Sequence, residues 1–354
     1  MHFLHVVGAR PNFMKVAPLT RALAARPGVR QTLVHTGQHY DRNMSDAFFR
    51  ELEIPEPDFN LAVGSGTHAE QTSQIMSRFE PVVVAQKPDW VLVYGDVNST
   101  IAAALVCAKL QIRVAHVEAG LRSFDRSMPE EVNRLLTDQV ADLLFTPSED
   151  GDRNLLREGV AQERIHLVGN IMIDTLVRLL PKAAATTVGV PGQYALVTLH
   201  RPSNVDDPSN LERLLDALTG IGATLPIIFP VHPRTRQKIA ELGFCHSERL
   251  RLWEPQPYLQ FLALQQKATV VITDSGGIQE ETTFLGVPCL TLRETTERPV
   301  TVTVGTNMII GRDMDLLCRE VKAVLKGERK QGGIPPLWDG RTAERIAQIL
   351  EAAR

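Results

Sequence analysis

Acidic side chains follow apolar segments at several points in the first half of the chain. Asp96 comes after DWVLVYG and Glu118 after RVAHV, while Glu130 and Glu131 stand behind a proline in MPEEVNR. Taken singly, Asp96 suits a helix N-cap, and either glutamate of the pair suits the first turn of a helix. Several acids on neighbouring loops of one sheet instead indicate a function in proton transfer, since helix capping does not require so many of them in one place.

Cations and histidines also stand where strand-like segments end. Arg10 and Lys15 lie in GARPNFMK, which matches neither GxGxxG nor the P-loop GxxxxGK[ST]. Two cations beside a helix N-terminus can hold one anion, although surface charge on an amphipathic helix explains them equally well. His200 in VTLHRP and His232 in PVHPRT end two further runs. One such histidine is usually structural, whereas two on adjacent strands indicate a functional edge.

The stretch DSGGIQEE combines an anion site with acids. Ser275, Gly276 and Gly277 are expected to expose consecutive backbone amides at a helix start, which suits a diphosphate. Glu280 or Glu281 follows one turn later, where a carboxylate can accept both hydroxyl hydrogens of a ribose. Arg298 follows the next strand. These residue types together predict a site for a nucleoside diphosphate linked to a sugar, and no metal-binding cluster is apparent.

The segments that must position these residues alternate between two kinds. Short apolar runs ending in Gly, Asp, Ser or Asn are separated by segments with helical periodicity, such as 98–110. This alternation predicts parallel sheets covered by helices on both faces. The runs form two series, at 3–8, 31–37, 89–96, 113–120, 142–148 and 164–170, and at 194–202, 226–233, 249–255, 268–277 and 287–294. The fold class is therefore α/β, with two Rossmann-like doubly wound domains expected to face a central cleft.

Length and composition are typical of a globular protein with two domains. The chain has 354 residues, a formal net charge of −3 and four scattered cysteines. The charge balance does not indicate a nucleic-acid partner, and no apolar run has the length of a membrane span. MHFLHVVGARP has no basic n-region and is expected to be a first strand. Free cysteines favour a reducing compartment, so we expect the cytoplasm.

At these motifs the chain resembles the non-hydrolysing UDP-N-acetylglucosamine 2-epimerase family, which has the glycosyltransferase-B (GT-B) fold. The matching stretches are GxRP with the lysine, GD, HVEAGLR, PEExNR, HR, PVHP, TDSGGIQEE and TTERP. The resemblance implies a first domain of residues 1–169 plus 341–354 and a UDP-binding domain of residues 170–340. It also implies a homodimer that needs no cofactor or metal.

The resemblance assigns roles to individual residues. Asp96, Glu118, Glu130 and His200 match the catalytic positions. The substrate-binding positions are Arg10, Lys15, His232, Gln256, Phe261, Ser275, Gly276, Gly277, Glu281 and Arg298. Of these, Gln256 and Phe261 stand where the family holds the uracil. Gln38, His39 and Gln71 fall near an activating UDP-GlcNAc site found in bacterial members.

The activity implied is reversible C2 epimerisation of UDP-GlcNAc to UDP-ManNAc, by elimination of UDP through 2-acetamidoglucal and re-addition. Asn12, Ser203 and Val300 replace acids of the family pattern, which leaves the exact sugar open. The alternatives are a related UDP-2-acetamido sugar, a hydrolysing variant releasing ManNAc, a GT-B glycosyltransferase and a non-catalytic UDP-sugar sensor. The last two do not require the acids of the first domain.

Overall fold

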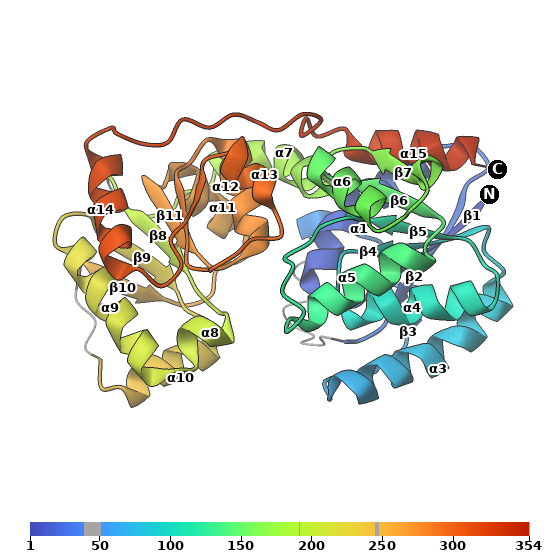
Figure 1. Ribbon diagram of the computed structural model, residues 1–354, viewed down its shortest axis with the longest axis horizontal. Coiled ribbons are helices and arrows are strands. Elements are labelled where there is room, and N and C mark those ends of the chain that lie inside the picture. The colour runs from blue at the N-terminus through green and yellow to red at the C-terminus, as the bar shows by residue number, and fades with distance from the viewer. Residues whose placement is uncertain (39–50, 191, 245–247, 354) are drawn as a thin grey trace. The chain divides into compact units, whose positions relative to one another are not determined.

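Two compact units make up the protein. The computed structural model describes residues 1–38, 51–190, 192–244 and 248–353 (Figure 1). The first unit comprises Met1–Arg178 and Pro336–Arg354, and the second comprises Leu179–Pro335. The sequence placed the corresponding boundaries at 169/170 and 340/341.

A parallel sheet of seven strands forms the centre of the first unit. Its strands are β1 (His2–Val7), β2 (Arg30–His35), β3 (Phe59–Asn60), β4 (Trp90–Tyr94), β5 (Val114–Val117), β6 (Leu143–Thr146) and β7 (Ile165–Leu167). They lie in the order β3-β2-β1-β4-β5-β6-β7. β1, β4, β5 and β6 are buried along their whole length, which explains their continuous apolar sequences. Only the two-residue β3 was not predicted.

Helices cover both faces of this sheet. Among the described residues they are α1 (Arg10–Ala24), α3 (His68–Gln86), α4 (Asn98–Lys109), α5 (Pro129–Val140), α6 (Glu149–Arg157), the 3-10 helix η1 (Gln162–Arg164) and α15 (Thr342–Ala352). The helix α7 (Ile171–Ala184) begins in the first unit and continues into the second after Arg178. In Figure 1, α15 lies above the sheet and α3 and α4 lie below it. The C-terminal helix α15 packs against α1, so both chain ends belong to the first unit.

The second unit repeats this plan with six parallel strands in the order β10-β9-β8-β11-β12-β13. The strands are β8 (Ala195–Thr198), β9 (Ile227–Pro230), β10 (Leu250–Trp253), β11 (Val270–Thr273), β12 (Cys289–Thr291) and β13 (Asn307–Ile309). The helices are α8 (Pro202–Val205), α9 (Pro208–Gly222), α10 (Pro233–Glu241), α11 (Tyr258–Lys267), α12 (Gly276–Leu285), α13 (Pro299–Thr303) and α14 (Met314–Leu325). The short β13 was not predicted. Asp207 caps α9, because its side chain accepts the Ser209 amide.

The strand orders bring the polar strand ends together within each unit. In the first unit the order changes direction between β1 and β4, and in the second between β8 and β11. Ligands of doubly wound sheets bind at the carboxyl ends of strands beside such a switch point. Asp96 and Glu118 follow β4 and β5, while His200 and Ser275 follow β8 and β11. Each unit thus positions one group of candidate residues.

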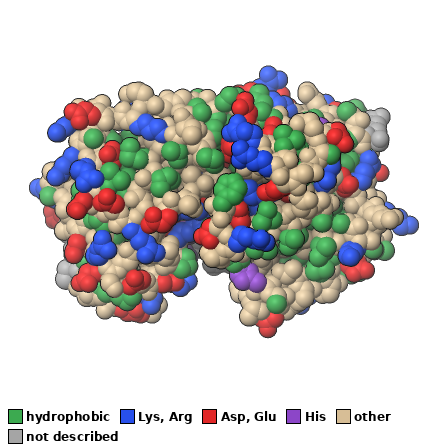
Figure 2. Space-filling view, in the orientation of Figure 1, with side chains coloured by type: hydrophobic (Ala, Val, Ile, Leu, Met, Phe, Trp, Pro, Cys, Tyr) green, Lys and Arg blue, Asp and Glu red, His purple; other side chains and the backbone are tan. Residues whose placement is uncertain are grey.

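The face of the molecule that Figure 2 shows has no large area covered by charges of one sign. Lys and Arg side chains are interspersed there with Asp and Glu on both units. None of the described helices combines the length and the hydropathy that crossing a bilayer requires.

Candidate active site

Lys15 and Glu118 form a buried ion pair in the first unit. Lys15 Nζ lies 2.7 Å from Glu118 Oε2, and both side chains are almost fully buried. Gly95 makes room for the pair, because a Cβ at this position would stand 2.6 Å from Lys15 Nζ. Its φ of +62° is also one that glycine adopts without strain. Lys15, which the resemblance assigned to substrate binding, therefore contacts a candidate catalytic carboxylate.

Glu118 itself has a strained backbone. Its φ is +73°, in the left-handed region that residues with a Cβ rarely adopt. The amides of Glu118 and Ala119 both donate to the carbonyl of Phe145, at 3.1 and 3.0 Å. Such conformations cost on the order of 1–3 kcal/mol and persist only where the surroundings hold them. The chain therefore maintains this carboxylate in its position at an energetic cost.

Arg134 connects Asp96 to the acids of α5. Its Nη1 donates to Asp96 Oδ2 at 3.0 Å, and its Nε lies 3.3 Å from Glu131 Oε2. Glu131 is buried and accepts the amide and hydroxyl of Ser123 and the amide of Phe124, each at 2.9 Å. Glu131 therefore anchors the loop before α5. The sequence interpretation missed Arg134, although PEExNR places it within one helical turn of both glutamates.

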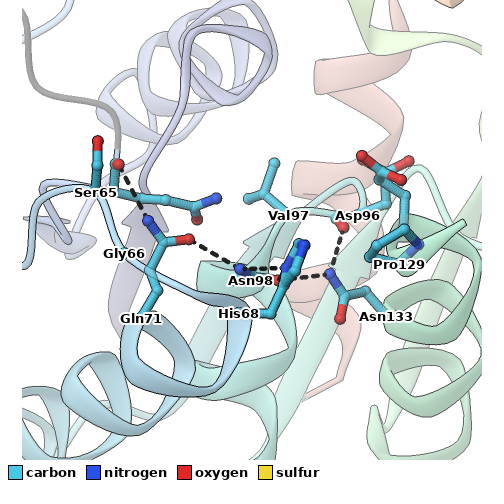
Figure 3. A pocket seen from close by; sticks show the side chains of 11 residues that line it. Ser65, Gly66, His68, Gln71, Asp96, Val97, Asn98, Pro129 and Asn133 are labelled. Atoms are coloured by element: carbon cyan, nitrogen blue, oxygen red, sulfur yellow. Dashed lines mark hydrogen bonds between the residues drawn. The ribbon is translucent and has the colours of Figure 1, made fainter. Parts of the chain in front are cut away.

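Glu130, in contrast, lines a pocket of about 290 Å³ together with Asp96. Figure 3 shows this pocket around Asp96. Gln38 and Gln71 line the same pocket. The Gln71 amide group donates to the carbonyls of Gln38 and Gly64, at 3.2 and 2.9 Å. The structure thus brings two of the predicted activator-site residues beside two predicted catalytic residues. The third predicted activator-site residue lies outside the described residues: His39.

Amide side chains organise the floor of this pocket (Figure 3). Asn98 Nδ2 donates to Gln71 Oε1 at 2.8 Å, and Asn133 Nδ2 donates both to Asn98 Oδ1 and to the carbonyl of Asp96, at 3.1 and 2.9 Å. His68 also lies against Asn98. These bonds connect α3, α4 and α5 behind Asp96.

The start of α1 shows why Asn12 can replace an acid. Asn12 Oδ1 accepts the amides of Gly8 and Ala9, at 3.0 and 3.1 Å, as a carboxylate could. Its Nδ2 donates to the Tyr94 carbonyl at 2.8 Å, which a carboxylate could not do. Arg10, the first residue of α1, is exposed.

In the second unit a buried carboxylate, Asp274, orients His200. Asp274 accepts the amides of His200 and Arg201 and the side-chain amide of Asn204, at 2.9 to 3.2 Å. His200 Nδ1 lies 3.0 Å from Asp274 Oδ1, while the ring is about half exposed. Burial works to raise the pKa of Asp274, but His200, Asn204 and the Arg201 amide together hold it below its usual value. The sequence interpretation did not assign Asp274 a role.

Arg298 lies over the start of α12. A Cβ at Gly276 would collide with Arg298 Nη1, so only glycine lets the guanidinium approach this helix end. Arg298 Nε is 2.8 Å from Glu280 Oε1, and Nη1 also contacts Glu297. Glu280, which the sequence offered only as an alternative to Glu281 for the ribose, therefore holds Arg298 in place.

The predicted row of free amides is shorter than expected. The Ser275 amide donates to Thr273 Oγ1 at 3.0 Å. Because α12 begins at Gly276, the amides of its first turn have no carbonyl four residues earlier within the helix. The amides available to an anion therefore begin at Gly276 and Gly277, one residue later than the sequence suggested.

Glu281 carries a carboxyl group whose pKa is raised. It is buried, and Oε1 accepts the Tyr258 hydroxyl at 2.8 Å. Burial raises the pKa of Glu281 to about 7, although hydrogen bonds from Tyr258 and Gln265 lower it in part. A carboxyl group with such a pKa changes its charge near neutral pH.

The remaining predicted binding residues are less constrained. His232 is exposed and caps α10, where its Nδ1 accepts the Arg234 amide at 3.4 Å. Gln256 donates to the Glu254 carbonyl at 2.7 Å, and Phe261 lies partly buried in α11. Within the described residues, no cluster of three or more His, Cys, Asp or Glu side chains could hold a metal.

Comparison with known proteins gives a consistent family. The family model described as UDP-N-acetylglucosamine 2-epimerase matches residues 21–351. A UDP-N-acetylglucosamine 2-epimerase of Methanocaldococcus jannaschii is 43% identical over 362 residues, covering 98% of this chain and 97% of that protein. A UDP-2,3-diacetamido-2,3-dideoxy-D-glucuronate 2-epimerase of Pseudomonas aeruginosa is 40% identical, covering 99% of both chains.

Solved structures agree. The Methanocaldococcus jannaschii enzyme, in complex with UDP-GlcNAc and UDP, superposes with a TM-score of 0.92 at 42% identity, covering 99% of this chain and 100% of that one. The lipopolysaccharide outer core galactosyltransferase WaaB, at 14% identity and full coverage of both chains, has a TM-score of 0.58. The second likeness concerns the fold alone, and it confirms the predicted GT-B-like architecture.

Proposed function

The chain belongs to the UDP-N-acetylglucosamine 2-epimerase family, and from this premise we propose that it interconverts UDP-GlcNAc and UDP-ManNAc by inverting C2 of the sugar. The observation that carries the proposal is the set of carboxylates at the strand ends of the first unit. Asp96, Glu118 and Glu130 accompany a second unit with the residues for a diphosphate and a ribose. A UDP-sugar sensor would have no use for these acids.

The chemistry requires the bond to UDP to break. The hydrogen on C2 is not adjacent to a carbonyl, so a side-chain base cannot remove it directly. When the C1–O bond breaks, the positive charge that develops at C1 acidifies this hydrogen. A carboxylate takes the proton, and 2-acetamidoglucal and UDP result. UDP then adds back to C1 while a proton reaches C2 from the opposite face, which restores the atoms of the substrate with C2 inverted.

Proton carriers are needed on both faces of the sugar ring, which accounts for several acids. Glu118 is fixed by Lys15 and by its strained backbone, and Asp96 is fixed by Arg134. Glu130 lies at the same pocket as Asp96 without belonging to the loop anchor that Glu131 forms. We therefore propose Asp96, Glu118 and Glu130 as the groups that exchange protons with the substrate.

The departing UDP accumulates negative charge, and the second unit carries groups suited to stabilise it. The first-turn amides of α12 and the guanidinium of Arg298 can bind the diphosphate. His200, oriented by Asp274, can donate a hydrogen bond from its exposed edge. Glu281 can accept the ribose hydroxyl hydrogens once it is ionised.

A second candidate substrate is UDP-2,3-diacetamido-2,3-dideoxy-D-glucuronate. The Pseudomonas aeruginosa relative named for that sugar is nearly as similar as the archaeal UDP-GlcNAc enzyme. Both sugars carry an acetamido group at C2 and UDP at C1, so the same elimination and re-addition apply. The Ser203 and Val300 departures from the family pattern do not decide between the two sugars.

The test is NMR analysis of the purified protein with each UDP-sugar in deuterated water. We expect a UDP-sugar inverted at C2 with deuterium at C2, since the proton is exchanged with solvent. Release of free ManNAc and UDP would identify a hydrolysing enzyme instead. Product without deuterium at C2 would refute the elimination. Parallel reactions with Glu118→Gln should give no turnover, while this variant retains affinity for UDP.

We further propose a homodimer and a cytoplasmic location. Val132 and Leu136 lie one turn apart on α5 with 37% and 51% of their surface exposed, an apolar feature suited to self-association. Light scattering of the wild type and of Leu136→Glu tests the dimer. Cys107, Cys289 and Cys318 carry free thiols, which suits a reducing compartment.

A further inference from the structure

His116 is a fully buried histidine of β5 that the proposed mechanism does not use. Its Nδ1 lies 2.6 Å from Asp138 Oδ1 on α5, and its Nε2 lies 2.8 Å from the carbonyl oxygen of Gly95, after β4. Each ring nitrogen therefore has one close partner, and the two partners belong to different elements.

Both of these partners are acceptors. A carbonyl oxygen can only accept, so His116 Nε2 must carry a proton. Asp138 Oδ2 accepts Arg122 Nη2 at 2.7 Å and the Gly120 amide at 3.1 Å, which is the pattern of an ionised carboxylate. Burial works to raise the pKa of Asp138, but the charges and hydrogen bonds of His116 and Arg122 hold it below its usual value. An ionised Asp138 requires a proton on Nδ1 as well.

The charges near His116 also favour a cationic ring. Arg122 also binds Glu158, through Nε at 2.8 Å and Nη2 at 2.6 Å. Asp138 and Glu158 contribute two negative charges to this chain of contacts, and Arg122 contributes one positive charge. Glu158 is partly exposed to solvent, whereas His116 and Asp138 are completely buried. An imidazolium gives the buried Asp138 carboxylate a second positive partner where Arg122 is shared with Glu158.

The groups that this imidazolium and its carboxylate bind belong to the loops of the candidate catalytic residues. Gly95 directly precedes Asp96, and Gly120 follows Glu118 by two residues. Gly95, Glu118 and Gly120 all have positive φ values, of 62°, 73° and 79°. The two glycines adopt this conformation without strain, but the Glu118 backbone persists only where its surroundings hold it.

We infer that His116 is held as a doubly protonated imidazolium and acts as a positioning residue that clamps the Asp96 turn and, through Asp138, the Glu118 loop. His116 does not touch the substrate in this account. Its protonation state is independent of the proposed function, whereas its effect on turnover rests on that function.

The protonation state is tested first, by long-range nitrogen-15 NMR of the histidine rings in the wild-type protein, at the pH of the activity assay. The His116→Gln variant assigns the signal. We expect both ring nitrogens to show the protonated shift, with two slowly exchanging ring protons. A ring with one unprotonated nitrogen would overturn the inference, whatever reaction the enzyme catalyses.

Turnover is tested with His116→Gln, whose side chain can donate to one acceptor but must present its own oxygen to the other. We expect kcat to fall by about tenfold to a hundredfold while KM changes less than about twofold, because displaced catalytic groups slow the chemical step. Glu158→Gln is the matched control, since it disturbs the same charge chain at the end remote from Gly95 and should change kcat less than about twofold.

Thermal unfolding of both variants separates positioning from general destabilisation. If His116→Gln lowers kcat no more than Glu158→Gln at a similar loss of Tm, the positioning role is wrong. If His116→Gln does not fold, Asp138→Asn replaces it in both tests. It assigns the His116 ring signal through the shift that the lost carboxylate causes, and in the kinetic comparison it should lower kcat with little change in KM.

Discussion

The affinity of the protein for UDP should depend on pH through Glu281. Burial raises the pKa of this carboxyl group to about 7, whereas the ordinary value is 4.5. The ionised carboxylate offers two strong acceptor oxygens to the hydroxyl hydrogens of a ribose, whereas the protonated group carries a donor on one oxygen and accepts more weakly. The uncomplexed protein at mildly acidic pH therefore holds Glu281 largely in the form that binds a ribose less well.

The size of the effect follows from the fraction ionised. If only the ionised form binds, the apparent Kd equals the intrinsic value divided by that fraction. One unit below a pKa of about 7 the ionised fraction is about one eleventh, and one unit above it is nearly complete. UDP should therefore bind about tenfold more weakly at about pH 6 than at about pH 8.

The same pKa shift predicts that the stability of the fold falls as the pH rises, whereas the affinity for UDP increases. Because the folded pKa of Glu281 is above the unfolded one, the folded state binds the proton more tightly. The stabilisation is complete below the ordinary value of 4.5 and is lost as the pH rises through about 7. At 1.36 kcal/mol per unit this loss amounts to about 3 kcal/mol, since the side chain is only 3% exposed. The side chain of the Glu281→Gln variant never ionises, so the variant should become more stable relative to the wild type as the pH rises.

Calorimetric titration with UDP across this pH range, on the wild type and on Glu281→Gln, measures the binding effect. The terminal phosphate of UDP titrates nearby, with a pKa of about 6, so the variant serves as the reference for the ligand's own titration. Uridine, which has no phosphate, provides a second reference. Urea unfolding of both proteins at about pH 4.5 and at about pH 8 measures the stability effect, since most of the loss lies between the unfolded and the folded pKa.

The reasoning fails if wild type and Glu281→Gln show the same dependence of Kd on pH. It also fails if the difference in their free energies of unfolding does not change between mildly acidic and mildly alkaline pH. A parallel loss of UDP affinity at every pH would mean that Glu281 contacts the ribose but is ionised throughout.

Three further substitutions have defined outcomes. Asp96→Asn should lower turnover by about 10²–10⁴-fold, the range for a lost acid or base, while calorimetry finds UDP affinity within about twofold of the wild type. Asp274→Asn should reduce kcat by at least about tenfold because His200 loses its orienting carboxylate, and steady-state kinetics should show little added loss when it is combined with His200→Asn. Gly276→Ala should weaken UDP binding at least about tenfold in the same calorimetric assay, since the new Cβ displaces Arg298 from the helix start.

Gly220→Ala is the control for the Gly276 substitution. Gly220 lies within α9, and a Cβ there would meet no atom within 4 Å. Alanine should therefore leave UDP binding unchanged and stabilise the fold by up to about 1 kcal/mol, in line with its higher helix propensity.

Much of the fold was predictable because buried parallel strands have continuous apolar sequences. The runs at 89–96 and 268–277, for example, contain β4 and β11 and end in the polar residues that reach the site. β3 and β13 were missed because two or three residues carry no period that distinguishes a strand from a loop. Both are edge strands, which their sheets hold by pairing on one side only.

The residue types of the site were predictable, but their partners were not. Motifs identified Glu130 and Glu131 as a pair without indicating which one anchors a loop, since this depends on the amides that each meets in space. Arg134 reaches Asp96 across 38 residues of sequence, and Lys15 reaches Glu118 across an even longer separation. No local pattern encodes such contacts.

These partners follow a common arrangement in both units. Asp96 is paired with Arg134, Glu118 with Lys15, His200 with Asp274 and Arg298 with Glu280. Each of these four groups is thus held by a charged side chain of the protein itself, and that partner is nearly or fully buried. A buried ion pair contributes little net stability compared with apolar packing, but removing one partner alone is strongly destabilising. Such pairs are therefore better explained by orientation than by stability. They hold each charged side chain in a defined position before any substrate binds. An enzyme that must pass a proton between opposite faces of one ring has particular need of that fixed geometry, because a misplaced carboxylate would return the proton to the face it came from.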